Sequence, residues 1–249
     1  MSWPESTRNS TAEHHLIEIN REAGDSIKRT LDFHRDRLGK LLQLDIDIKS
    51  WEKTLSSRPE ISQIKEGQVS LAHSIYAAAA GQYRHAYSGL RLFLELSFAA
   101  VYFSANELSR RRWLSDRQDF SWSRALDETK GILAKDFVQE FNPRAVESAA
   151  QYAVTAASCY RTCSQFLHGK DAVTRDLPLS FSYTESAFVP WSDVALKSAE
   201  CVLFLIFCRY GDETSLADPG ILATLEHSFS HIEFMREILG MPIEKKVNL

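Results

Sequence analysis

An arginine and a histidine lie seven residues apart in the segment YRTCSQFLHGK, residues 160–170. Since each helical residue turns the chain by about 100°, Arg161 and His168 fall within about 20° of each other on one helix face. Ser164 and Gln165 lie between them on that face. Histidine suits proton transfer, and a planar guanidinium suits a spread negative charge. The spacing therefore predicts one exposed, concave site with residue types that suit phosphate chemistry.

The same residues also fit the ordinary end of a helix. His168 precedes Gly169, the residue type expected just past a helix end, and a basic side chain in the last turn favours the negative end of the helix dipole. The opposite face of this helix is apolar and is expected to be core. It comprises Tyr152, Cys159, Cys163, Phe166 and Leu167. The sequence alone therefore fits two interpretations of this segment, a functional site and an ordinary helix end.

A second polar stripe crosses the most apolar part of the chain. Arg84, Ser88, Arg91 and Glu95 follow one another at helical spacing. Because buried charges are costly unless they are paired, one interpretation is an internal salt bridge between Arg91 and Glu95, which are four residues apart. The other is that the stripe faces Arg161 and His168 and orients them or binds phosphate.

The remaining basic candidates are weaker. Arg110, Arg111 and Arg112 form a basic run at an expected helix end, and Lys170 follows the Arg–His helix. Solvation and interaction with the helix dipole are the default interpretation of the run. RNA contact is the alternative for these four side chains.

No metal or cofactor is expected. His227 and His231 are four residues apart, but the acidic residue of the H-E-x-x-H motif is absent. The sequence also lacks the glycine-rich loops that bind nucleotides and the G-x-S-x-G turn of serine hydrolases. The chemistry available to this chain is therefore that of its own side chains.

The composition favours a helical protein in a reducing compartment. The chain has 249 residues, with 44% hydrophobic and 25% charged residues, and only 10 glycines and 7 prolines. A net charge of −4 provides no overall basic field for nucleic acid. The four cysteines, Cys159, Cys163, Cys201 and Cys208, lie in apolar contexts and are expected to be reduced. Without a signal peptide or a spanning segment, a cytoplasmic protein with no membrane contact is expected.

The hydrophobic pattern predicts an all-α bundle with a long N-terminal helical arm. The expected domains are the arm, residues 1–60, and the helical bundle, residues 61–249. Helices are expected over residues 13–55, 61–108, 120–141, 143–168, 192–210 and 221–239. The segment SSRPE separates arm from bundle. An irregular loop is expected over residues 171–191, and loops of that length are often functional.

The Arg–His helix resembles the motif of the HEPN superfamily, all-helical proteins that include many toxin and antiviral ribonucleases. Their signature is an arginine, four to six residues and a histidine near the end of a long helix. This chain has six residues between Arg161 and His168. The resemblance covers residues 65–240. Thr162 stands where catalytic members usually carry asparagine, aspartate or histidine.

The resemblance implies a HEPN-like RNA-binding protein or a metal-independent endoribonuclease, a possible toxin or antiviral-defence effector. In such chemistry the 2′-hydroxyl attacks the adjacent phosphate and leaves a cyclic phosphate end. One histidine does not readily serve as both base and acid, so the resemblance also implies a homodimer in which two such helices face each other. The alternative is a catalytically silent helical adaptor that binds a partner protein.

Overall fold

The computed structural model describes residues 5–242, and within them there is no β-strand. Five long helices make up most of this part. They are α1 (Glu5–Thr54), α2 (Ile61–Ala79), α3 (Tyr83–Ala105), α7 (Val146–Leu167) and α9 (Glu185–Tyr210). The shorter elements are α4 (Glu107–Leu114), α5 (Trp122–Ala125), α6 (Lys135–Phe141), a 3-10 turn (Pro143–Ala145), α8 (Asp171–Thr174), α10 (Glu213–Leu216), α11 (Pro219–Phe229) and α12 (Glu233–Ile238). The prediction of an all-α bundle with a long N-terminal helix is confirmed.

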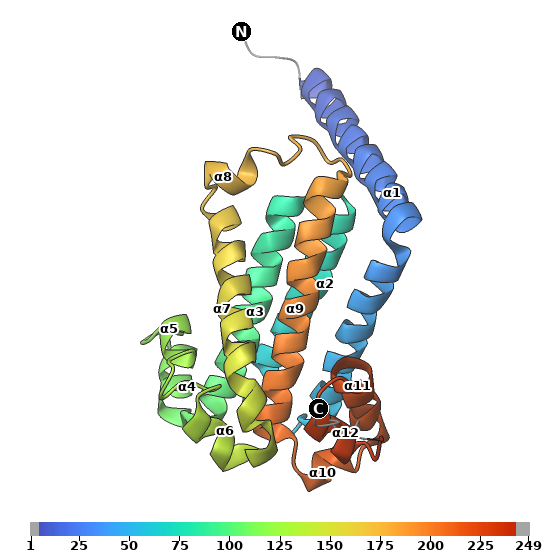
Figure 1. Cartoon of the computed structure of the whole chain (residues 1–249). Coiled ribbons are helices and arrows are strands. Elements are labelled where there is room, and N and C mark those ends of the chain that lie inside the picture. The colour runs from blue at the N-terminus through green and yellow to red at the C-terminus, as the bar shows by residue number, and fades with distance from the viewer. Residues whose placement is uncertain (1–4, 243–249) are drawn as a thin grey trace.

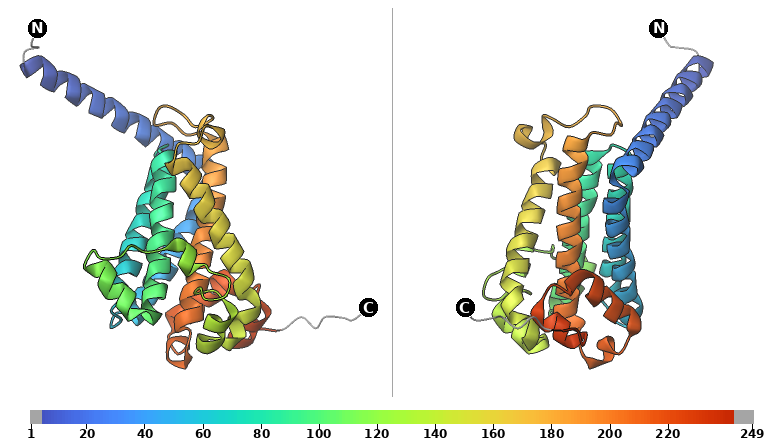
Figure 2. Two further views of the ribbon diagram at one scale, coloured as in Figure 1. Left: turned by 90° about the vertical axis from the view of Figure 1, so that its left-hand side faces the viewer. Right: turned by 45° about the vertical axis from the view of Figure 1, so that its right-hand side comes forward.

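The long helices run side by side, and α1 alone extends well past them (Figures 1 and 2). Helices α2 and α3 form a hairpin, while α7 and α9 pack on each other and on α3. The backbone of α1 is not helical at His34, where φ is −135° and ψ is 30°. The kink at His34 divides α1 into a part along the bundle and a part that projects from it (Figure 1).

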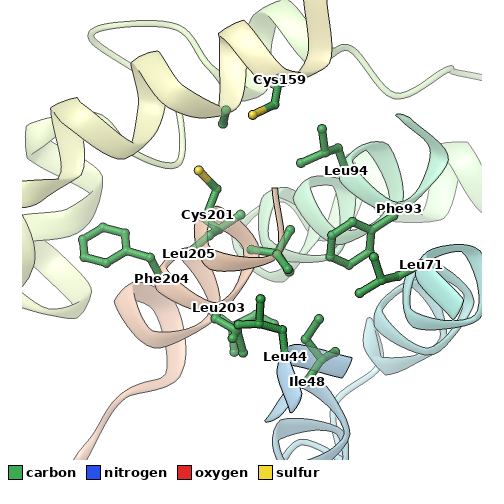
Figure 3. Close-up of a cluster of buried hydrophobic side chains, with 14 of the residues drawn as sticks. Leu44, Ile48, Leu71, Phe93, Leu94, Cys159, Cys201, Leu203, Phe204 and Leu205 are labelled. Atoms are coloured by element: carbon green, nitrogen blue, oxygen red, sulfur yellow. The ribbon is translucent and has the colours of Figure 1, made fainter. Parts of the chain in front are cut away.

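Helix α9 supplies the centre of the core. Every residue from 201 to 208 has a relative exposure of 0%. A helix that is apolar all round must be covered on all sides, and α9 contacts α1, α2, α3, α6 and α7. Figure 3 shows Leu203, Phe204 and Leu205 of α9 among side chains from four of these neighbours, including Ile48 and Phe93. The core is therefore organised around one helix.

The core also includes the second half of α1. Leu41, Ile48 and Trp51 are fully buried and belong to the same apolar cluster as α9. The expected boundary near residue 60 coincides with the turn after α1, but the core continues across it. The part that projects is the N-terminal half, where Leu16 and Ile17 are exposed. Residues 1–4 and 243–249 of the expected domains lie outside the described residues.

The expected single helix over residues 61–108 is wrong. A turn at residues 80–82 divides it into α2 and α3, and α3 ends before α4 begins. Gly81 permits the turn because its φ is +77°, a value that other residues rarely adopt. Ala and Leu on both sides of the turn favour helix, so the hydrophobic pattern of a helix is not interrupted there. Gly81 alone indicates that the chain reverses its direction.

Two other expected segments are corrected. Residues 120–141 contain α5 and α6 separated by irregular chain, instead of one helix. Helix α9 begins at Glu185 with Pro190 inside it, instead of being capped by Ser192. Tertiary contacts explain the earlier start, because Phe188 is fully buried and stacks on His34 at 4.8 Å between ring centroids. The expected loop over residues 171–191 therefore shrinks to α8 and residues 175–184.

The four cysteines are free and buried, as expected from their apolar contexts. Burial raises the pKa of Cys201 and Cys208 well above that of an ordinary thiol. None of the described helices combines the length and the apolar character that crossing a bilayer requires.

Replacing Gly81 with alanine tests the turn between α2 and α3. A Cβ there would lie 2.6 Å from the backbone nitrogen of Ser182, and φ would be strained as well. We expect Gly81→Ala to lower the free energy of unfolding by about 2–3 kcal/mol, measured by urea denaturation. Gly39→Ala is the matched control, because a Cβ at this position in α1 meets nothing within 4 Å. The control should gain about 0.5–1 kcal/mol, and equal effects of the two variants would contradict this description of the turn.

Candidate functional site on the outer face of α7

Arg161 and His168 both lie exposed on the outer face of α7. Ser164 and Gln165, between them, are half-buried. None of these four side chains has a hydrogen bond or ion pair among the described residues. Four cavities of the described chain are lined by other residues, so the expected concave site stays a prediction.

The rotation of α7 is fixed by its apolar side. Ala156 and Cys163 are fully buried. Tyr152 stacks on Phe204 of α9 with ring centroids 3.9 Å apart. At the other end of α7, Phe166 stacks on Tyr87 of α3 at 3.7 Å. These contacts turn Arg161 and His168 away from the core.

The prediction that all five residues of the apolar face are buried is wrong for Leu167. Leu167 was expected to be buried but is 46% exposed. It lies in the last turn of α7. Together with Arg84, His85 and Ser88 it lines a shallow cavity of about 270 Å³.

The end of α7 is closed by its own backbone. The N–H of Lys170 donates to the carbonyl of Gln165 at 3.1 Å, and the N–H of Gly169 donates to the carbonyl of Phe166 at 3.1 Å. This is the Schellman pattern, and the φ of +60° at Gly169 completes it. Because these carbonyls already have donors, the imidazole of His168 is not needed to cap them.

Arg91 and Glu95 form the expected salt bridge, with 2.9 Å between Nη2 and Oε1. Their third partner is Tyr160, whose hydroxyl accepts from Arg91 at 2.8 Å and donates to Glu95 at 2.6 Å. Tyr160 and Arg161 are consecutive on α7, so their side chains point about 100° apart. The structure thus gives the stripe on α3 a different partner from the expected Arg161 and His168.

The protonation states of this triad are mutually consistent. Burial raises the pKa of the Tyr160 phenol, and its hydrogen bond to the Glu95 carboxylate raises it further. Burial alone would lower the pKa of Arg91, but the hydrogen bond that Arg91 donates to Tyr160 and the charge of Glu95 outweigh it and raise that pKa. The phenol therefore remains a donor to a carboxylate beside a charged guanidinium.

The sequence analysis gave no role to Tyr160, which bonds to Arg91 and Glu95, or to Trp122, which packs on Tyr160. The Trp122 ring stacks on Tyr160 with centroids 4.0 Å apart, and the Arg91 guanidinium lies 5.0 Å from the Tyr160 ring centre. Tyr160 was visible as the first residue of the quoted segment. Trp122 lies in α5, a helix of four residues. Such a short helix has no hydrophobic periodicity from which its packing beside Tyr160 could be predicted.

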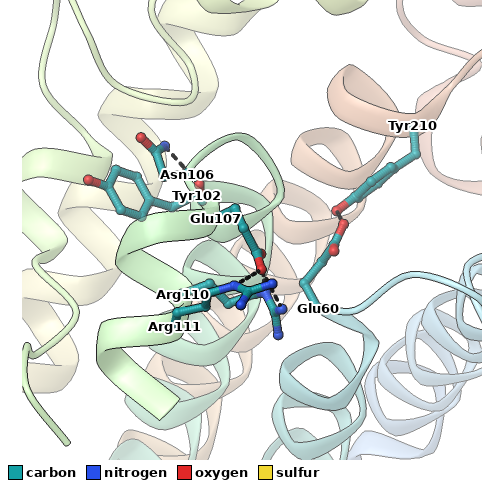
Figure 4. A network of polar contacts seen from close by, with 7 residues as sticks. All are labelled: Glu60, Tyr102, Asn106, Glu107, Arg110, Arg111 and Tyr210. Carbon is teal, nitrogen blue, oxygen red and sulfur yellow. Dashed lines mark hydrogen bonds and ion pairs between the residues drawn. The ribbon is translucent and has the colours of Figure 1, made fainter. Parts of the chain in front are cut away.

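The basic run lies far from the Arg–His face. Arg110, Arg111 and Arg112 belong to α4, toward the end of the bundle opposite the end of α7 that carries His168 (Figure 1). Glu107 accepts from Arg110 at 2.6 Å and from Arg111 at 2.7 Å (Figure 4). The hydrogen bond from Arg110 is the largest cause, and that from Arg111 the second, of a pKa of Glu107 lowered to about 2.

The other expected basic residues remain at the surface. Arg84 and Lys170 are exposed near the ends of α3 and α7. Ser88 donates its hydroxyl to the carbonyl of Arg84 at 2.9 Å, which occupies that hydroxyl within α3.

His227 and His231 lie in different surroundings. His227 Nδ1 lies 3.9 Å from Oδ1 of Asp47 in α1, whereas His231 lines a cavity between α7 and α9. In the part of the chain that the structure describes, there is no group of three or more His, Cys, Asp or Glu side chains placed to hold a metal ion.

Comparisons with protein families, with curated proteins and with solved structures find no match to this chain.

The Tyr160 triad predicts a measurable stability effect. Tyr160→Phe keeps the ring and its stacking but removes two hydrogen bonds to charged groups. We expect it to lower the free energy of unfolding by about 1 kcal/mol, measured as a lower urea midpoint with an unchanged slope. Tyr102→Phe is the control, because the hydroxyl of Tyr102 has no hydrogen bond among the described residues. A loss as small as that of the control would show that the triad contributes nothing to stability.

Proposed function

We propose that this protein is a HEPN-like, metal-independent endoribonuclease that acts as a homodimer. The observation that carries the proposal is the state of Arg161 and His168. Both are exposed in the last two turns of a long helix, both lack partners among the described residues, and the helix end is capped without them. Exposed polar side chains with no structural task are candidates for function.

The outer face of α7 supports the dimer. Ala150, Val154 and Ala157 precede Arg161 at spacings of three and four residues, and all are exposed. Val154 alone is 66% exposed. Such a stripe suits pairing with a second helix, and a two-fold axis would bring the same stripe of two copies together.

A cavity beside this stripe adds to its apolar character. It measures about 380 Å³ and is lined by Leu126, Leu133 and Val146 as well as by Val154. A second copy packed on the first half of α7 would cover this cavity and Val154. The polar half of the stripe would then meet its own counterpart at the end that carries His168.

The proposed chemistry uses two copies of His168. One imidazole takes the proton from the 2′-hydroxyl while the 2′-oxygen bonds to phosphorus. The bond from phosphorus to the 5′-oxygen breaks, and the second copy's His168, which starts as the protonated imidazolium, gives that oxygen a proton. Arg161 stabilises the negative charge that develops on the phosphorane. The products are a 2′,3′-cyclic phosphate and a 5′-hydroxyl, so no metal and no cofactor enters the reaction.

The role proposed for this activity is that of a toxin or antiviral-defence effector in the cytoplasm, as the HEPN resemblance implies. The competing adaptor function uses the same surface. In that case the stripe around Val154 binds a partner protein, and Arg161 contacts that protein instead of RNA.

RNA cleavage in the presence of EDTA tests the proposal. We expect wild-type protein to cut single-stranded RNA, and His168→Ala and Arg161→Ala each to lower the rate by about 10²-fold or more. Neither variant should lose more than about 0.5 kcal/mol of stability, because both side chains are exposed. A histidine that only interacts with the helix dipole would cost about 0.3–1 kcal/mol and leave any cleavage unchanged.

His73→Ala is the matched control, since His73 is exposed on α2, a helix that carries no residue of the proposed site. This variant should cut RNA at the wild-type rate. Wild-type protein that cuts no RNA while a partner protein co-purifies with all variants would favour the adaptor function.

A further inference from the structure

A polar cavity of about 490 Å³ lies between α7 and α9, away from the Arg161–His168 face. Gln151 and Thr155 line it from α7, and Lys197 and Glu200 line it from α9. His231, in the turn between α11 and α12, lines it from a third side. Its size falls within the range of about 300–1,000 Å³ that small-molecule sites occupy.

Glu200 is the unusual group in this cavity. Its side chain is half-buried, yet no hydrogen bond or ion pair reaches it from the described residues. Desolvation raises the pKa of this carboxyl, although His231, Lys197 and Lys40 each act to lower it. A desolvated carboxylate without a bonded partner is costly, and a bound cation would remove that cost.

The charges around the cavity favour a positive ligand. Glu147 and Glu200 bring two carboxylates to the lining, against the ammonium of Lys197 and the imidazole of His231, and Lys40 acts on Glu200 from outside the lining. Lys197 is exposed, and its long side chain can move into solvent when a ligand enters. The amide of Gln151 and the hydroxyl of Thr155 add neutral hydrogen-bonding groups on the opposite wall.

The cavity is built for binding more than for covalent chemistry. Its one thiol, Cys201, is fully buried and donates to the carbonyl of Tyr152 with 3.7 Å between sulfur and oxygen. Burial keeps the pKa of Cys201 well above the ordinary value, so the thiol stays protonated and weakly nucleophilic. Too few metal-ligating side chains of the described chain gather here to hold a metal ion.

We propose that this cavity binds a small organic cation with a primary ammonium group. The ammonium pairs with Glu200, and Glu147 and Gln151 receive the rest of a short amine or diamine chain. The site is independent of RNA cleavage, because Glu200, which pairs with the ammonium, lies on α9, and Gln151 lies about 80° from Arg161 around α7.

Calorimetric titration of the full chain with three probes of similar length tests this site. The probes are 1,4-diaminobutane, the neutral 1,4-butanediol and the dianion succinate, each in buffer with enough salt to screen surface charge. We expect only the diamine to bind and to raise the melting temperature. Binding of succinate in place of the diamine, or of none of the probes, would overturn the proposal.

Three variants locate the site. Glu200→Gln should weaken diamine binding about tenfold or more, the loss expected when an ion pair worth about 1.4 kcal/mol is removed. Glu140→Gln, on the exposed surface of α6, removes the same charge elsewhere and should bind like wild type. Lys197→Gln should bind at least as tightly as wild type, because it removes a competing cation. Equal binding by the variants at Glu200 and Glu140, or loss of binding in the variant at Lys197, would contradict this assignment.

Discussion

The structure depends on the burial of one helix. Residues 201–208 of α9 expose nothing to solvent, and each large apolar side chain removed from water stabilises the fold by about 1.5–3 kcal/mol. No single neighbour can cover a helix that is apolar on every side. Helices α1, α2, α3 and α7 therefore surround α9, and each presents its own apolar stripe inward. The surfaces left outside are the ones available for function.

The orientation of α7 follows from that constraint. Its small buried residues, Ala156 and Cys163, let it approach the core closely, and the Tyr160 triad ties its side to Arg91 and Glu95 of α3. With the helix held at those points, Arg161 and His168 must face solvent. The cavity between α7 and α9 has a different lining, because polar side chains of both helices and His231 of the turn between α11 and α12 face it.

The sequence predicted the helical class, the long first helix and the apolar side of α7, because each depends on a periodic pattern within one segment. It also paired Arg91 with Glu95, whose spacing within α3 is enough to join them. It failed where the outcome depended on contacts between segments. The turn at Gly81 fits beneath the backbone of Ser182, and Phe188 extends α9 past Pro190 by packing on His34. Tyr160 was likewise assigned no role, since its partners lie on α3 and α5.

The central claim is that two copies bring the ends of α7 together and so join two Arg–His pairs. Ser164 lies between Arg161 and His168, so a thiol placed there would meet its counterpart across the two-fold axis. The four native cysteines are buried and should not react. The most direct measurement is the rate at which Ser164→Cys forms an interchain disulfide under mild oxidation, compared with Thr162→Cys, an equally half-buried position on the same helix about 160° away. The account predicts rapid crosslinking only at Ser164. Equal rates at both positions, or a Ser164→Cys chain that stays uncrosslinked, would contradict it.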